Sequence, residues 1–93
     1  MVSDRLRAWI AGHFPPEDVE PVLSMLVELE YLGEEIERIQ AAVVLLSGGD
    51  SGRFLDAVAL AQVDWRDLLV AAQLAHADWP ARLDAALGPS SGP

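Results

Sequence analysis

The fold of this protein is decided by EEIERIQAAVVLL, residues 34–46, which is followed by Ser47-Gly48-Gly49. The large apolar side chains of this stretch, with one just before it, alternate at intervals of four and three: Leu32, Ile36, Ile39, Val43 and Leu46. That spacing keeps one face of a helix apolar. Beyond Gln40 the polar face disappears as well, and a helix that is apolar all round is a buried helix. We therefore expect the C-terminal half of helix 34–46 to lie at the centre of the fold.

The composition is that of one small globular domain. A chain of 93 residues, 52% of them hydrophobic, is long enough to enclose one core. It contains no cysteine, which excludes disulfides and thiolate metal sites. No apolar run approaches the roughly 18–20 residues that cross a membrane, and the N-terminal segment lacks the pattern of a signal peptide. We therefore expect a cytoplasmic protein.

The charge is strongly acidic. The formal net charge is −9, and the only cationic residues besides two histidines are six arginines. So few cations cannot neutralise a row of phosphates, which argues against nucleic-acid binding. The acidity keeps an apolar-rich protein soluble, and it would also favour a basic partner.

The N-terminal third indicates two helices. Ser3 can cap a first helix, which Pro15-Pro16 must end because proline lacks the backbone donor that a helix needs. A second helix then begins, with proline in its first turn and acids behind it. Pro21 should kink this helix or split off its first turn. The segment 22–31 can therefore be one helix, a kinked helix or partly extended, since residues 27–31 also alternate like a strand.

A fourth helix follows the glycine pair. Asp50 or Ser51 opens it, and its inner face is expected to carry Phe54, Leu55 and Val58. Val63 ends it, because the residues that follow begin a new pattern.

That new pattern is an Asp-Trp pair that occurs twice. Asp64-Trp65 and Asp78-Trp79 lie in segments that match at an offset of fourteen residues. An aspartate side chain can accept hydrogen bonds from the free amides of a first helical turn. We therefore expect two capped helices at about 65–75 and 79–87. Gly88-Pro89 ends the second, and residues 89–93 are expected to form a disordered tail.

Several short patterns suggest chemistry, and each fits a structural role better. Gly49-Asp50-Ser51-Gly52 is the tetrapeptide around the nucleophile of trypsin-like serine proteases, but this chain is too short to form their two β-barrels. The same turn lacks the lysine of a phosphate loop and the oxygen ligands of a calcium loop. His76 and Asp78 lack a third zinc ligand nearby, and the acidic run 28–37 lacks Glu-x-x-His. We therefore assign no catalytic, cofactor-binding or metal-binding residue.

An apolar contact surface is the most informative remaining feature. The candidates for binding a partner are Trp65, Trp79, Leu26 and Leu29. An exposed tryptophan is a typical hot spot of a protein interface. The alternative is that both tryptophan rings pack inward beneath the central helix, and the sequence allows both arrangements.

The second half of the chain resembles a group of short bacterial all-α proteins with no assigned activity. The resemblance spans residues 36–88 and is carried by RIQAAV at 38–43, GGD at 48–50, DWRDLLVAA at 64–72 and DWP at 78–80. It implies a helical fold and a bacterial source. It implies no catalytic activity.

These observations predict an all-α fold, a single domain over residues 1–88 with five or six short helices packed around the buried helix 34–46. For the function, we expect a small acidic interaction or accessory protein that binds a protein partner or a second copy of itself. Nothing in the sequence indicates a cofactor, a small-molecule ligand or a membrane. The alternative is an enzyme or metal-binding protein whose site the sequence does not reveal.

Overall fold

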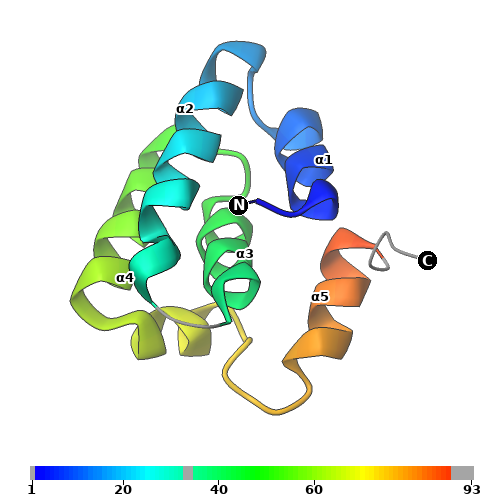
Figure 1. Ribbon diagram of the computed structural model, residues 1–93, viewed down its shortest axis with the longest axis vertical. Coiled ribbons are helices and arrows are strands. Elements are labelled where there is room, and N and C mark those ends of the chain that lie inside the picture. The colour runs from blue at the N-terminus through cyan, green and yellow to red at the C-terminus, as the bar shows by residue number, and fades with distance from the viewer. Residues whose placement is uncertain (1, 33–34, 89–93) are drawn as a thin grey trace.

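The computed structural model describes residues 2–32 and 35–88, and every secondary-structure element within these ranges is a helix (Figure 1). In chain order its elements are α1 (Asp4–His13), α2 (Pro16–Glu28), the 3-10 helix η1 (Leu29–Leu32), α3 (Ile36–Ser47), α4 (Ser51–Ala71) and α5 (Trp79–Leu87). The predicted all-α class is confirmed. The predicted tail, residues 89–93, lies outside the described residues.

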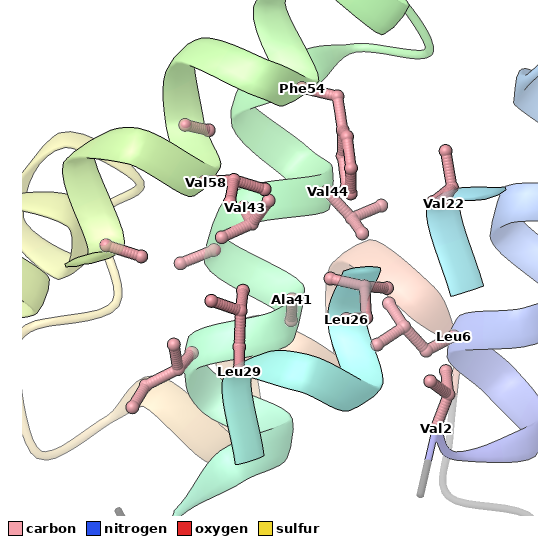
Figure 2. Close-up of a cluster of buried hydrophobic side chains, with 14 of the residues drawn as sticks. Val2, Leu6, Val22, Leu26, Leu29, Ala41, Val43, Val44, Phe54 and Val58 are labelled. Atoms are coloured by element: carbon pink, nitrogen blue, oxygen red, sulfur yellow. The ribbon is translucent and has the colours of Figure 1, made fainter. Parts of the chain in front are cut away.

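Helix α3 occupies the centre, as predicted. Figure 1 shows it with α4 on one side and with α1 and α5 on the other. Its consecutive residues Ala41, Ala42, Val43 and Val44 are all 0% exposed, so every side of the helix is covered. Figure 2 shows Ala41, Val43 and Val44 together with Phe54 and Val58 of α4 and Leu26 of α2. The predicted helix 34–46 is observed as Ile36–Ser47, and Glu34 lies outside the described residues.

The N-terminal helices agree with the sequence analysis in position and differ in detail. Helix α2 runs through Pro21 without interruption, and the 22–31 segment continues into η1, so none of it is extended. Burial of Val22, Leu23 and Leu26 on one face outweighs the one backbone hydrogen bond that proline removes. Ser3 precedes α1, but its hydroxyl does not cap the helix; it donates to Glu37 Oε2 at 2.6 Å.

Helix α4 contains the boundary that the first Asp-Trp pair predicts. At Asp64 the backbone leaves the helical region (φ −156°, ψ 93°), and the Asp64 carboxylate accepts from the amides of Arg66 (3.0 Å) and Asp67 (3.3 Å). The second half ends at Ala71 and not at residue 75. The inward assignment of Leu55 was wrong, because 53% of this residue is exposed.

The second Asp-Trp pair behaves differently. Helix α5 has the predicted bounds, but Asp78 makes no capping bond to the backbone. Its Oδ2 accepts from Arg82 Nε at 3.0 Å instead. The prediction that Asp78 caps α5 was therefore wrong, since the neighbouring guanidinium is the better donor.

Candidate functional site

The residues predicted to bind a partner divide into two pairs. Leu26 and Leu29 are 0% and 1% exposed, because α2 and η1 turn them into the core, so their assignment to a contact surface is corrected. Trp65 and Trp79 are half-buried against the core, and each ring lies beneath an arginine.

The turn that resembles a protease nucleophile has a structural role. Asp50 is the N-cap of α4 and accepts from Arg53 N at 2.9 Å. The Ser51 hydroxyl donates to Asp18 Oδ2 at 2.6 Å, which joins the start of α4 to α2. His76 lies in the connection between α4 and α5, as expected. Within residues 2–32 and 35–88, no three His, Asp or Glu side chains gather as a metal site would require.

Helix α5 is fastened to α1 and α3 by an ion network around Arg5, whose side chain is only 10% exposed. The guanidinium pairs with both oxygens of Glu37, at 3.0 Å from Nε and 2.9 Å from Nη2. Its Nη1 reaches Asp84 Oδ1 at 2.5 Å and the carbonyl oxygen of Gly88 at 3.0 Å. The hydrogen bond from Arg5, followed by that from Ser3, lowers the pKa of Glu37 against the opposing effect of burial. The same pairing with Glu37 raises the pKa of Arg5.

A second arginine fixes the connection between α4 and α5. Arg38, on α3, donates from Nε to the carbonyl oxygen of Leu74 at 2.8 Å. Its guanidinium carbon also lies 5.2 Å from the centroid of the Trp79 ring, within the range of a cation–π contact. The connection, residues 72–78, is therefore held at its middle and at its end.

The backbone of this connection begins with an unusual residue. Gln73 has a φ of 61°, and among the described residues it is the one non-glycine with a positive φ. The amide of Gln73 bonds to Val70 O at 3.1 Å and that of Leu74 to Leu69 O at 2.8 Å. This pair of bonds is the Schellman ending of a helix, in which glycine ordinarily takes the left-handed position.

Gln73 borders a surface hollow of about 290 Å³, which we call the loop hollow. Its lining residues are Val70, Gln73, Ala75, His76 and Arg82. A second hollow shares Gln73 and Arg82 and continues along α5 to Ala85 and Ala86. Arg82 Nη1 donates to Gln73 Oε1 at 3.3 Å, so the two side chains meet where the hollows join. A guanidinium among small apolar side chains can bind a carboxylate that carries an apolar group.

The sequence analysis missed both Gln73 and Arg82. It extended the helix to residue 75, because glycine, the usual mark of a left-handed helix end, is absent there. Arg82 gives no signal of its own, because the hollow beside it is formed by residues on both sides of the connection.

Large apolar side chains remain exposed elsewhere on the surface. Over the described residues these are Val27 (46%), Tyr31 (70%), Leu55 (53%), Val63 (85%) and Val70 (64%). Val63 stands immediately before the break in α4, and Val70 lines the loop hollow. Isolated apolar side chains are normal on a surface, but Val63 and Val70 each have most of their surface in water.

Comparison with protein-family models, with curated proteins and with solved structures gives no match. The resemblance to short bacterial proteins therefore stays a prediction. No helix in the described part of the chain combines the length and the apolar character needed to cross a bilayer.

Proposed function

We propose that this chain is a small acidic interaction or accessory protein of the bacterial cytoplasm, which acts by binding another protein. The observation that carries the proposal is the exposure of large apolar side chains, led by Val63 at 85% and Tyr31 at 70%, on a fold whose core is already closed. Burying such groups against a partner is favourable, at about 25 cal/mol for each Å² of apolar surface removed from water. Glu28 and Asp64, which are exposed and lie near Tyr31 and Val63 in the sequence, can supply part of a polar rim.

Several of the polar groups that suggested chemistry have structural partners, which agrees with a protein that works by contact. Asp50 caps α4, Ser51 bonds to Asp18, and Glu37 pairs with Arg5. A catalyst requires a base or nucleophile placed for reaction, whereas a binding protein requires only a suitable surface.

The test is affinity purification of tagged protein from the source cells, comparing the natural chain with Val63→Ser and Tyr31→Ser. We expect a partner that the natural chain captures and that at least one variant loses. Ala11→Ser, at an exposed position on α1, is the matched control and should retain the partner. Identical capture by all four chains would contradict a role for the exposed apolar side chains.

The simplest partner is a second copy of the chain. Most homodimers are two-fold symmetric, so one apolar patch can meet itself. Sedimentation over a wide concentration range tests this version. A monomer at every concentration would remove it, and a dimer that Val63→Ser dissociates would support it.

A further inference from the structure

The loop hollow is the place where this fold keeps a strained residue. A left-handed conformation at a residue with a side chain is costly, and Gln73 adopts it (φ 61°) where glycine would do so freely. Strained residues of this kind cluster at functional sites. The Gln73 side chain accepts a hydrogen bond from Arg82, which also lines the hollow.

Arg82 has donors to spare. A guanidinium carries five N–H donors. The Arg82 side chain donates from Nε to Asp78 and from Nη1 to Gln73, and the second bond is long at 3.3 Å. The remaining donors lie on a side chain that is 44% exposed, and none of the residues that line the loop hollow is acidic. Asp78 already pairs with Arg82 at Nε but does not line the hollow, so a ligand carboxylate can approach the remaining N–H donors from the hollow.

Arg5, Arg38 and Arg53 do not offer an accessible guanidinium beside a hollow free of acidic lining residues. The side chains of Arg5 and Arg38 are 10% and 15% exposed and are committed to the fold. Arg53 borders a different hollow, but Asp56 lines that hollow with it and would repel an anion. On a chain with a net charge of −9, the loop hollow thus combines an accessible cation, the ring nitrogens of His76 and apolar walls from Val70 and Ala75.

We infer that the loop hollow binds the C-terminal residue of a partner protein, with the α-carboxylate on Arg82 and an apolar side chain against Val70 and Ala75. A C-terminal residue carries both groups on one Cα, and a hollow of about 290 Å³ has room for about one residue. Terminal carboxylates are a recurring target of peptide-binding proteins. This inference rests on the proposed function, because it names the chemistry by which the partner is recognised.

The test uses N-acetyl-leucine, which carries the carboxylate and the apolar side chain, and N-acetyl-leucinamide, which lacks only the charge. In ¹H–¹⁵N spectra of the natural chain, N-acetyl-leucine should shift the resonances of the loop hollow with millimolar affinity, as expected for so small a probe. The amide should bind at least about fivefold more weakly because it loses the charge-assisted hydrogen bonds. Absence of saturable shifts at the hollow, or equal binding of the amide, would overturn the inference.

Two substitutions complete the experiment. Arg82→Gln removes the charge at an exposed position and should weaken N-acetyl-leucine binding about fivefold or more. Arg66→Gln, which removes an arginine that lies over Trp65, is the matched control and should leave the affinity unchanged. An unchanged affinity in folded Arg82→Gln would also overturn the inference. If capture of a partner still depends on Val63 or Tyr31 in that case, the proposed function stands and only the site is wrong.

Discussion

The chain leaves α3 and α4 through the same backbone conformation but with different residues. Gly48 ends α3 at a φ of 59°, and Gln73 follows the end of α4 at a φ of 61°. The first connection turns within residues 48–50 and lets α4 fold back along α3, the most extensive helix pair in the structure. The second runs over residues 72–78 and reaches α5, which packs on α1 and α3.

The difference separates a connection set by packing from one that carries a site. At the first turn, glycine meets a backbone requirement at no steric cost. At the second connection, a strained glutamine occupies the same kind of position, and its side chain reaches Arg82 beside the loop hollow. Glycine would meet the backbone requirement at both positions without strain, so the glutamine is consistent with the binding site inferred at the loop hollow.

The largest expected effect is at the packed turn. At Gly49 a Cβ would stand 2.5 Å from the carbonyl oxygen of His13, and the φ of 89° adds strain. Gly49→Ala should therefore lower the free energy of unfolding by about 3 kcal/mol, measured by urea denaturation. Gly48→Ala is the matched control, because a Cβ there meets nothing within 4 Å. It should cost only about 1 kcal/mol, from φ alone. Equal losses of stability in the two variants would show that a Cβ at position 49 does not clash with His13 of α1.

The next prediction concerns the ion network that joins α5 to the rest of the fold, in contrast to the apolar packing of α3 against α4. The α3–α4 pair is joined by apolar packing, whereas α5 is joined to α1 and α3 partly by Arg5, Glu37 and Asp84. The pKa of Glu37 is lowered in the folded protein, chiefly by its hydrogen bond from Arg5. Its contribution to stability is therefore present above the unfolded glutamate pKa of about 4.3 and is lost as the pH falls through the lower folded value.

Urea denaturation of Glu37→Gln tests this contrast. At pH 7 the variant should be less stable than the natural chain by about 2 kcal/mol, less than a fully buried pair would lose. The difference should shrink as the pH is lowered below about 4, because the natural chain then loses the same charge. Val43→Ala, which removes apolar packing in α3, should show a difference that does not depend on pH. A constant difference for Glu37→Gln would mean that the ion pair contributes little.

The sequence was sufficient for the parts of the fold that depend on local pattern. The all-round apolar run at residues 41–44 placed α3 at the centre, and Asp64 marked a helix start that the backbone confirms. The bounds of α5 followed from Asp78, Pro80 and Gly88. Each of these signals involves residues within a few positions of one another.

The ion network around Arg5 was beyond such reasoning because it is assembled from residues that lie far apart in the chain. Arg5 bonds to Glu37, which lies 32 positions away in the sequence, and to Asp84, which lies 79 positions away. No pattern in the sequence relates these residues. Leu26 and Leu29 were assigned to a surface because their apolar character does not say which way the helix turns. Gln73 was hidden because a polar residue replaces the glycine that signals a helix end.

The two Asp-Trp pairs give a smaller effect and separate a true cap from an apparent one. The Asp64 carboxylate accepts hydrogen bonds from two backbone amides, whereas the Asp78 carboxylate accepts one from the Arg82 side chain and none from an amide of α5. Asp64→Ala should cost about 1 kcal/mol, and Asp78→Ala should cost about 0.5 kcal/mol or less, as for an exposed ion pair. The measurement is the urea midpoint of each variant. A larger cost at Asp78 would show that this carboxylate caps α5 in solution.

The smallest expected effect has the opposite sign and tests the comparison of the two helix endings directly. Gln73→Gly relieves the left-handed strain, which favours the folded state, and it also frees the unfolded backbone, which opposes part of that gain. The net result should be a protein more stable by about 0.5 kcal/mol. If Gln73 serves the loop hollow, the same variant should bind N-acetyl-leucine more weakly, since Arg82 loses the side chain that orients it. Gain of stability with loss of binding is the trade that a functional site imposes. A variant that is both more stable and equally able to bind would mean that Gln73 has no part in the site, and a less stable variant would mean that its bond to Arg82 outweighs the strain.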